Sequence, residues 1–216
     1  MKPYAESCEQ NRAPILEVLK PRLEGCQRVL EIGSGTGQHG VYFAAAMPQL
    51  HWQCSDREEN LPGIRMWLQE ARLPNLGQPL LLDVEQTPWP GVQAEAVFSA
   101  NTVHIMHWPQ VQALFAGVGR LLPEQGRFFL YGPFNYNGQY SSDSNRQFDA
   151  WLRARDPHSG VRDFEALNKL AQQAGMTLIE DIAMPANNRI LYWRKRSPHQ
   201  SGSLRSESGG ATMWRE

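Results

Sequence analysis

The sequence has few of the features that mark secreted, zinc-binding or membrane proteins. It contains only three cysteines, Cys8, Cys26 and Cys54, an odd number with no C-x-x-C pair. This argues against a disulfide framework and a cysteine-based metal site, and it favours reduced thiols. No run approaches the roughly 18 apolar residues of a membrane-spanning helix, and the N-terminus lacks the apolar core of a secretory signal. We therefore expect a cytoplasmic protein with no membrane partner and no bound metal.

The sequence also lacks an excess of charge of either sign. It has 21 lysine and arginine residues against 22 aspartate and glutamate residues. A nucleic-acid-binding surface usually shows as an excess of basic residues, so we do not expect a nucleic acid partner. Hydrophobic residues make up 41% of the 216 positions, which is typical of one globular domain with a sizeable core. We predict a single domain over residues 1–196 and a disordered, Ser/Gly/Arg-rich tail over 197–216.

Short apolar runs alternate with helical patterns along the chain. The expected strands cover 28–32, 50–56, 78–84, 95–101 and 126–132, followed by a pair at 176–184 and 189–194. The expected helices cover 11–24, 40–47, 61–72, 111–122, 147–155 and 163–174, with Asn11 capping the first and a long polar loop at 133–145. This alternation predicts an α/β fold, with a mostly parallel sheet and helices on both faces. The final pair has a short connection and should be antiparallel.

The stretch from Val29 to Gly40 predicts a ligand site. An apolar strand ends at Ile32, and glycines follow at 33, 35 and 37 before a helix begins. Glycines let the backbone approach a ligand closely, and a helix N-terminus presents unpaired N–H groups. The literal G-x-G-x-x-G from Gly35 to Gly40 would indicate a dinucleotide, but in that fingerprint the first glycine follows the strand directly. Here that residue is Gly33, which gives G-x-G-x-G. An ordinary strand, turn and helix without a ligand is the third interpretation.

An acidic residue inside the same strand, Glu31, also needs an explanation, because a buried charge is costly without partners. The run Val-Leu-Glu-Ile-Gly-Ser-Gly-Thr-Gly37 resembles motif I of class I S-adenosylmethionine (SAM) dependent methyltransferases. The resemblance covers about residues 12–195. It implies a Rossmann-like class I methyltransferase fold, with a seven-stranded, mostly parallel sheet that ends in an antiparallel strand pair.

The chain further resembles a small group of largely uncharacterised methyltransferase-like proteins. The matching stretches are Asn-Arg-Ala-Pro-Ile15, Glu-Ile-Gly-Ser-Gly-Thr-Gly-Gln-His39, Leu-Tyr-Gly-Pro-Phe134, Arg-Asp-Pro157 and Met-Pro-Ala-Asn-Asn188. The class as a whole uses SAM as a methyl-donor cosubstrate. The resemblance therefore predicts SAM as the cofactor and leaves the methyl acceptor open.

The predicted cofactor contacts lie at the ends of strands, where open α/β sheets bind their ligands. They are Glu31, Gly33, Ser34, Gly35, Gly37, Asp56, Asp83, Val84, Ser99 and Asn101. Asp56 can accept hydrogen bonds from two ribose hydroxyls, which SAM and NAD both carry. The resemblance implies that Asp83 and the N–H of Val84 contact adenine. Either acid is also compatible with an ordinary turn or helix cap.

The candidates for chemistry follow the fourth and fifth strands. His104 is the candidate catalytic base, because imidazole titrates near neutral pH. Local packing explains His104 equally well, and it is the better explanation for His107. The substrate-side candidates are Asn11, Arg12, Tyr131, Asn135 and Arg155. Arg155 belongs to a charged cluster that could bind an anionic group, but such clusters are more often solvated salt bridges.

The sequence therefore predicts a SAM-dependent methyltransferase that acts on a small molecule or an exposed protein side chain. One alternative is a protein that binds SAM or a nucleotide without catalysis, since no substrate motif is recognisable. A second is an NAD(P)-dependent oxidoreductase, against which Gly33 and Glu31 stand. A nucleic-acid methyltransferase is disfavoured, because Ser99-Ala-Asn-Thr102 replaces the Asn/Asp-Pro-Pro-Tyr/Phe motif. The acceptor and the oligomeric state are not predicted.

Overall fold

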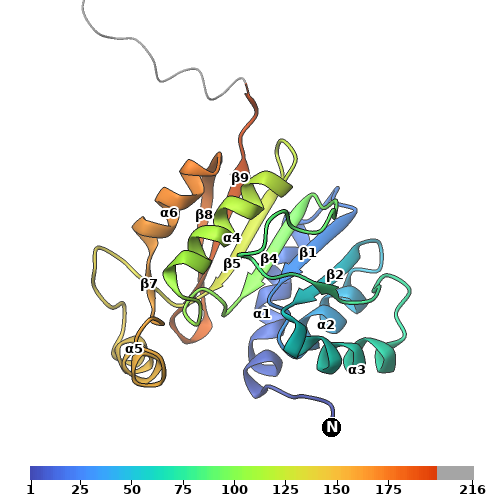
Figure 1. Ribbon diagram of the computed structural model, residues 1–216, viewed down its shortest axis with the longest axis horizontal. Coiled ribbons are helices and arrows are strands. Elements are labelled where there is room, and N and C mark those ends of the chain that lie inside the picture. Colours follow the sequence, from blue (N-terminus) through green and yellow to red (C-terminus); the bar gives the residue numbers. More distant parts are fainter. Residues whose placement is uncertain (199–216) are drawn as a thin grey trace, which may run out of the picture.

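A seven-stranded sheet forms the centre of the molecule (Figure 1). The computed structural model describes residues 1–198. The strand order is β3-β2-β1-β4-β5-β9-β8. The strands are β1 (Arg28–Ile32), β2 (His51–Asp56), β3 (Leu80–Leu81), β4 (Ala96–Ala100), β5 (Arg127–Gly132), β8 (Met176–Met184) and β9 (Asn188–Lys195). Strands β1 to β5 are parallel, whereas β9 is antiparallel to both β5 and β8. The predicted sheet, with its closing antiparallel pair, is confirmed.

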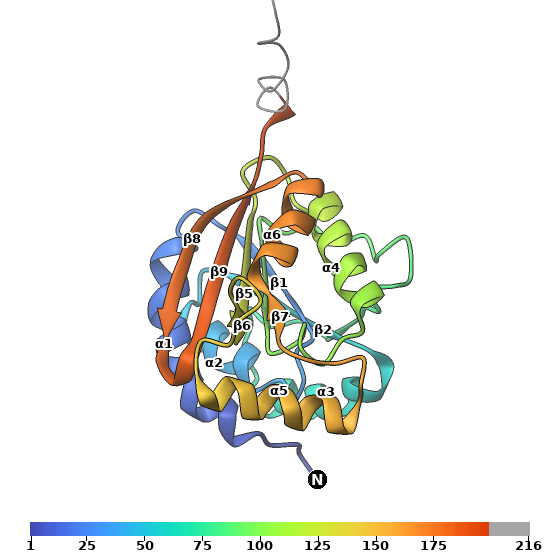
Figure 2. The same cartoon turned by 90° about the vertical axis from the view of Figure 1, so that its left-hand side faces the viewer.

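Helices cover both faces of this sheet, as predicted. They are α1 (Glu6–Arg22), α2 (Gln38–Ala46), α3 (Leu61–Ala71), α4 (Trp108–Leu121), α5 (Asp143–Arg155) and α6 (Phe164–Gln173). Side chains of α1, α2 and α3 pack in one core cluster, and those of α4 and α6 pack in another. Figure 2 shows that α5 crosses below the sheet, at the edge where the parallel strands end. Among residues 1–198, no helix is long and apolar enough to cross a membrane.

The alternation of side chains along the strands builds the two cores. In β5, Phe128 and Leu130 face the α4/α6 core, while Phe129 and Tyr131 face the α1/α2/α3 core. Successive residues of a strand point to opposite faces, so an unbroken apolar run supplies both layers. This explains why the central strands carry no polar alternation in sequence.

The first helix begins five residues earlier than predicted. Asn11 lies inside α1 and does not cap it, because the helix starts at Glu6. The N-cap residue Ala5 offers no side-chain acceptor; instead its N–H donates to Gln38 Oε1 at 2.7 Å. The helix start is thus fixed by a residue distant in sequence, which no local capping signal reveals.

The predicted loop at 133–145 is largely structured. Phe134–Asn135 forms β6, which pairs in parallel with β7 (Arg162–Asp163). Helix α5 begins at Asp143 rather than 147, because the Ser142 side chain accepts a hydrogen bond from the N–H of Asn145. The predicted strand at 78–84 is reduced to Leu80–Leu81, an edge strand that pairs only with β2. The predicted tail at 197–216 lies outside the described residues, except for 197 and 198.

Candidate functional site

Two cavities lie side by side where the parallel strands end. The first, here called the glycine-turn cavity, has a volume of about 340 Å³ and is lined by residues 31–36 of the glycine turn. The second, here called the His104 cavity, has a volume of about 570 Å³ and includes His104, Tyr131 and Phe148. Ser7 and Asn101 line both cavities. The two spaces are therefore adjacent and share part of a wall.

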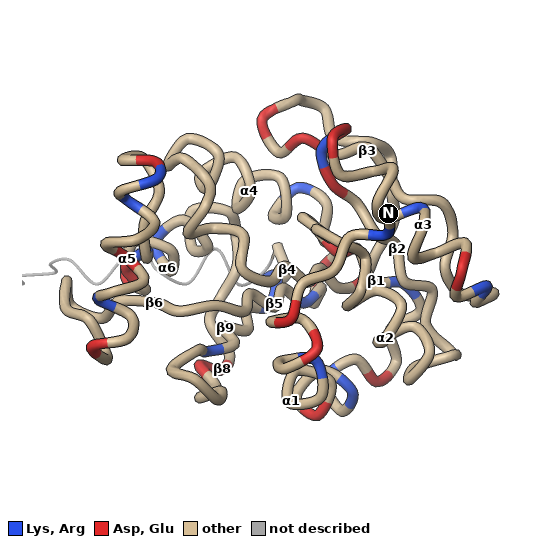
Figure 3. Tube along the Cα trace, turned by 90° about the horizontal axis from the view of Figure 1, so that it is seen from below, with Lys and Arg blue, Asp and Glu red and all other residues tan. Residues whose placement is uncertain are grey.

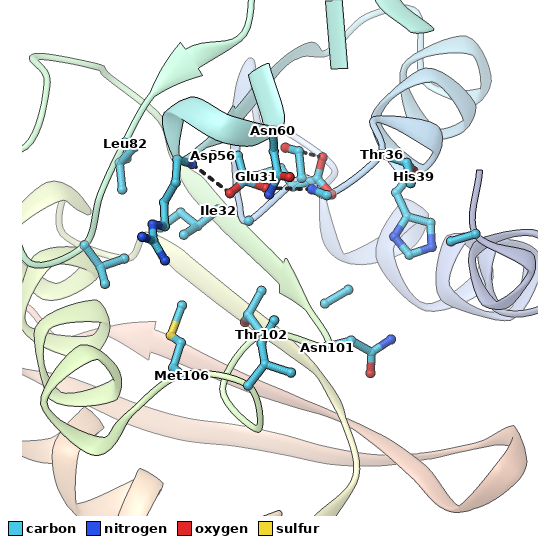
Figure 4. A pocket seen from close by; sticks show the side chains of 18 of the residues that line it. Glu31, Ile32, Thr36, His39, Asp56, Asn60, Leu82, Asn101, Thr102 and Met106 are labelled. Carbon is cyan, nitrogen blue, oxygen red and sulfur yellow. Dashed lines mark hydrogen bonds between the residues drawn. The ribbon is translucent and has the colours of Figure 1, made fainter. Parts of the chain in front are cut away.

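Glu31 is a buried acid in the wall of the glycine-turn cavity (Figure 4). Its Oε1 accepts hydrogen bonds from Ser34 Oγ at 3.0 Å and from Trp52 Nε1 at 3.2 Å. Burial raises the pKa of Glu31 to about 7, although these two hydrogen bonds oppose the shift. Glu31 therefore loses its proton near neutral pH, and a cation in this cavity would favour the ionised form.

Asp56 holds the glycine turn from the end of β2. Its Oδ2 accepts a hydrogen bond from the N–H of Gly35 at 2.8 Å, and its Oδ1 accepts one from the N–H of Arg57 at 2.7 Å. Each carboxylate oxygen keeps a second lone pair that a ligand hydroxyl can use. The same side chain can thus shape the turn and bind a ligand at the cavity wall.

Positions 33 and 37 both require glycine, although a Cβ would meet different neighbours at each. Gly33 has φ +73°, and a Cβ there would lie 2.6 Å from the Thr102 side chain. Gly37 has φ +96° and lies against α3, where a Cβ would meet the Ile64 backbone at 3.3 Å. Gly37 does not line either cavity, so its visible role is the close packing of α2 on α3. A left-handed backbone disfavours other residues at both positions.

The far end of the glycine-turn cavity is mostly apolar. Leu82 and Val84 lie on one side of it, and Ile105 and Met106 contribute from the segment after β4. Asp83 stands between the first two, and its Oδ1 accepts a hydrogen bond from the N–H of Glu85 at 3.0 Å. Apolar walls beside a polar strand end suit a flat heteroaromatic ring with a polar edge.

The start of α1 closes the glycine-turn cavity from a direction the sequence does not reveal. Ser7 and Cys8 lie in its wall, held there by the contact of Ala5 with Gln38. Burial raises the pKa of Cys8 to about 11, so its thiol is neutral near pH 7. The first helix therefore contributes to both cavities, with Ser7 and Cys8 in the wall of the glycine-turn cavity and Asn11 in the wall of the His104 cavity.

The His104 cavity contains an imidazole with an unused nitrogen. His104 is buried, and its Nδ1 has no hydrogen-bond partner. Burial, helped by the charge of Arg162, lowers the pKa of His104 to about 4, so the ring is neutral at pH 7. The edge of the ring meets Phe148, with ring centroids 5.1 Å apart. A neutral, unpaired imidazole in a cavity can accept a proton from a bound molecule.

Charged residues of both signs surround this end of the molecule. Figure 3 looks onto it and shows them distributed over α1, α3 and α5. His107, the second histidine after β4, lies outside the cavities, with its Nε2 2.6 Å from Asp156 Oδ2. Within residues 1–198, no group of three or more His, Cys, Asp or Glu side chains is placed to hold a metal ion.

The family of this chain follows from its sequence match. A family model with the description Protein of unknown function (DUF938) matches residues 2–195. The chain belongs to this family. The match covers both cavities and all seven strands of the central sheet. The family description assigns no activity, so the site must be interpreted from its geometry.

Several solved structures have a similar fold. Human N-acetylserotonin methyltransferase in complex with SAM is 14% identical to this chain, with a TM-score of 0.75. The match covers 89% of this chain and 53% of the human enzyme's chain. An O-methyltransferase family 2 protein from Planctomyces limnophilus DSM 3776, in complex with apigenin, is 17% identical, with coverages of 88% and 57% and a TM-score of 0.76. The SAM-dependent methyltransferase SibL, in its apo form, is 18% identical, with coverages of 88% and 56% and a TM-score of 0.75.

The likeness to these enzymes shows the fold. The chain has the Rossmann-like class I methyltransferase fold that motif I predicted. It spans little more than half the length of these neighbours, 53–57%. At identities of 14–18% their activities are not carried over to this DUF938 protein by likeness alone.

The structure places most predicted site residues on a cavity wall. Those on the glycine-turn cavity are Glu31, Gly33, Ser34, Gly35, Asp56, Asp83, Val84 and Asn101, and those on the His104 cavity are Asn11, Asn101, His104 and Tyr131. Ser99 lies behind the wall, where its Oγ donates to the carbonyl of Ile32 at 2.8 Å. Its position supports the end of β4 against β1 rather than facing a ligand.

Three predicted substrate-side residues lie outside both cavities. Arg12 pairs with Glu9 at 2.9 Å, and Asn135 is buried in β6. Arg155 is exposed on α5, where it stacks on the Trp151 ring at 4.5 Å. Arg155 thus lies on the surface, away from both cavities.

Sequence reasoning missed the walls of the His104 cavity that come from distant segments. They are Gln10 and Pro14 of α1, Ser144, Asn145 and Phe148 of α5, and Pro185, Ala186 and Asn188 at the turn between β8 and β9. Two of the matching stretches, Asn-Arg-Ala-Pro-Ile15 and Met-Pro-Ala-Asn-Asn188, contain some of these residues, but nothing in either stretch indicates that they meet in one cavity.

Proposed function

We propose that this protein is a SAM-dependent methyltransferase, with SAM in the glycine-turn cavity and the methyl acceptor in the His104 cavity. The observation that carries this proposal is the adjacency of the two cavities at Asn101 and Ser7. Methyl transfer is an in-line displacement, so the two reactants must meet across a short gap in a fixed orientation. Two adjoining cavities, one with cofactor-type features and one with a free base, suit that requirement.

The glycine-turn cavity fits each chemical part of SAM. Asp56 would accept hydrogen bonds from the ribose hydroxyls, and Asp83 would contact the adenine edge between apolar walls. Glu31, with its pKa raised to about 7 by burial, would complement the positive charge of the cosubstrate. When bound, SAM supplies an electrophilic methyl group attached to a sulfonium.

The residues of the His104 cavity would orient and deprotonate the acceptor. Asn101 stands at the junction, where φ +56° turns the chain at the end of β4. The imidazole of His104 would accept a proton from an acceptor O–H or N–H group, because burial keeps it neutral, with a pKa of about 4. In this proposal Asn101 positions the acceptor, and His104 is the catalytic base.

Calorimetry with SAM, S-adenosylhomocysteine, NAD⁺ and NADH tests the cofactor. We expect both adenosyl compounds to bind and neither nicotinamide cofactor to compete with them. Absence of SAM and S-adenosylhomocysteine binding at millimolar concentration would overturn the proposal, and NADH binding would favour the oxidoreductase. Gly33→Ala is the cavity variant and Gly91→Ala the matched control, since a Cβ at Gly91 meets nothing within 4 Å.

Radiolabelled SAM tests catalysis separately from binding. We expect labelled product when the protein is incubated with an extract of the cells from which it comes, formed about 10²–10⁴-fold more slowly by His104→Gln. Binding of SAM without any labelled product would favour the alternative of a non-catalytic SAM-binding protein.

A further inference from the structure

We propose that the methyl acceptor is an uncharged small molecule, and that it presents a hydroxyl group to His104 beside Gly132. This inference rests on the proposed methyltransferase function and names the substrate class of the same site. It follows from the lack of charge in the His104 cavity, from the pairing of the charges around it, and from the approach of two of its lining residues, Asn101 and His104, to Gly132.

The His104 cavity is lined entirely by uncharged side chains. Of the fourteen described residues that line it, none is Asp, Glu, Lys or Arg. Burial keeps even its one titratable imidazole neutral, because the pKa of His104 is lowered to about 4. A carboxylate, phosphate or ammonium group entering this space would lose hydration without gaining a counter-charge, which is costly. The cavity therefore selects against charged acceptors.

Cations on the elements around the cavity are paired with other groups, including Arg146 of α5, which lies 3.5 Å from Asp143. Arg12 forms a salt bridge with Glu9 at 2.9 Å. Arg189 does the same with Asp181 at 2.7 Å. The guanidinium of Arg162 donates to the carbonyls of Val103 and His158 at 3.1 and 2.9 Å. A charged acceptor would have to break one of these interactions to find a partner.

The polar groups in the wall suit an uncharged molecule. Side-chain amides come from Gln10, Asn11, Asn101, Asn145 and Asn188, and hydroxyls come from Ser7, Tyr131 and Ser144. Amides offer both donors and acceptors, so they can bind hydroxyl, carbonyl and ether groups without a charge. Pro14, Phe148 and Pro185 add apolar surface. Uncharged donors and acceptors beside apolar surface suit a small molecule that carries hydroxyl, carbonyl or ether groups.

Gly132 is the point where the reactive groups converge. A Cβ built on Gly132 would lie 3.7 Å from Asn101 Oδ1 and 3.9 Å from His104 Nδ1. The Nδ1 atom is buried and has no partner, so a hydroxyl hydrogen from a bound acceptor would satisfy it. A Cβ at Gly132 would make only ordinary contacts, with the Phe134 ring as the third neighbour at 3.8 Å, so the missing side chain leaves room for that hydroxyl. This space lies next to Asn101, which lines both cavities.

The step balances with the two substrates alone. A bond forms between the acceptor oxygen and the methyl carbon of SAM, and the bond from that carbon to sulfur breaks. The sulfur keeps the electron pair, which leaves neutral S-adenosylhomocysteine. The hydroxyl proton passes to Nδ1 of His104 and from there to solvent, and the product is an uncharged methyl ether.

Charge fractionation of the acceptor pool tests the inference. A small-molecule extract of the native cells is separated at pH 7 into anionic, cationic and neutral fractions, and the macromolecules are kept as a fourth. Each fraction is incubated with the protein and radiolabelled SAM. We expect label in the neutral fraction. Label in the anionic, cationic or macromolecular fraction instead would overturn this inference while leaving the methyltransferase proposal intact. No label in any fraction, with S-adenosylhomocysteine binding shown by calorimetry, would overturn both.

The variant Gly132→Ala tests the location of the hydroxyl. The added methyl group makes only ordinary van der Waals contacts, and φ at Gly132 is outside the left-handed region, so the fold should tolerate it. We expect at least a tenfold loss of turnover on the neutral fraction, with affinity for S-adenosylhomocysteine unchanged within twofold. Gly91→Ala is the matched control. Unchanged turnover in folded Gly132→Ala protein would show that the reacting hydroxyl lies elsewhere.

Discussion

The glycine-turn cavity and the His104 cavity share a wall but differ in charge. The first includes Glu31, Asp56, Arg57, Glu59 and Asp83, whereas the described lining of the second contains no Asp, Glu, Lys or Arg. This difference matches two ligands of different chemistry, a cationic nucleoside and an uncharged acceptor. The two cavities also differ in the elements that build them. The charged cavity comes mainly from strand ends, while the uncharged one is assembled from α1, α5 and the turn before β9.

The largest expected effect comes from His104, which belongs to the uncharged cavity alone. His104→Gln removes the base but keeps a polar side chain, so turnover should fall by about 10²–10⁴-fold. Affinity for S-adenosylhomocysteine should not change, since His104 does not line the glycine-turn cavity. Initial rates with labelled SAM measure the first quantity, and calorimetry the second.

The same measurement on His107→Gln provides the control, because His107 lies on the surface against Asp156. The pH profile adds a second test. The base acts as neutral imidazole, and burial lowers the pKa of His104 to about 4. The wild-type rate should therefore show no decrease attributable to histidine between pH 8 and pH 6. Equal losses in both variants would contradict the role of His104.

Gly33→Ala should destabilise the protein and weaken ligand binding in the charged cavity, without changing which acceptor is methylated. The substitution costs roughly 1–2 kcal/mol for a left-handed backbone and about 1–3 kcal/mol for the contact with Thr102. Together these predict a loss in the free energy of unfolding of about 2–5 kcal/mol, measured by urea denaturation, with weaker S-adenosylhomocysteine binding. Gly91→Ala should change neither quantity. A Gly33→Ala protein as stable as that control would show that the turn tolerates a side chain.

Glu31→Gln, a substitution in the charged cavity, should make the folded protein more stable relative to wild type at neutral pH. Burial raises the pKa of Glu31 from 4.5 to about 7, so its folded-state pKa lies above the unfolded value. The associated stability is fully present below pH 4.5 and is lost as the pH rises through 7. Urea denaturation at several pH values should thus show the variant gaining about 3 kcal/mol over wild type between pH 4.5 and pH 8. A difference that does not depend on pH would contradict the shifted pKa.

Arg155→Ala should have the smallest effect. Arg155 stacks on Trp151 at the surface and lines neither cavity. Turnover and stability should change by less than about 0.5 kcal/mol, as for ordinary surface substitutions. A large loss of turnover would mean that the acceptor extends out of the His104 cavity along α5 as far as Arg155.

The sheet and the glycine turn could be predicted because their signals are local. The apolar run ending at Ile32 marks a buried strand, and the spacing from Gly33 to Gly37 marks a turn with a left-handed backbone. Asp56 and Asp83 could be placed near the turn because parallel strands end at the same edge. For this half of the site, the order of elements and the strand ends were sufficient.

The acceptor side could not be predicted in the same way, since its walls depend on tertiary contacts. The start of α1 is fixed by Gln38, and Asn145 reaches the carbonyl of Asn187 at 3.2 Å across 42 residues of sequence. Gly132 lies in the matching stretch Leu-Tyr-Gly-Pro-Phe134, but only the positions of Asn101 and His104 in the structure give it a role. Arg155 was predicted as a substrate contact because charged side chains often bind ligands. The described lining of the acceptor cavity is uncharged, so no charge pattern in the sequence indicates its position.

Cys8 offers a way to follow cofactor occupancy before any acceptor is known. It is partly exposed in the wall of the glycine-turn cavity, whereas Cys26 and Cys54 are buried. Because burial raises the pKa of Cys8 to about 11, N-ethylmaleimide should label it slowly, and faster as the pH increases. Saturating S-adenosylhomocysteine should block that labelling in the native protein, so a mass spectrum of the alkylated chain reports whether the site is filled. The molecule thus carries its own footprinting probe.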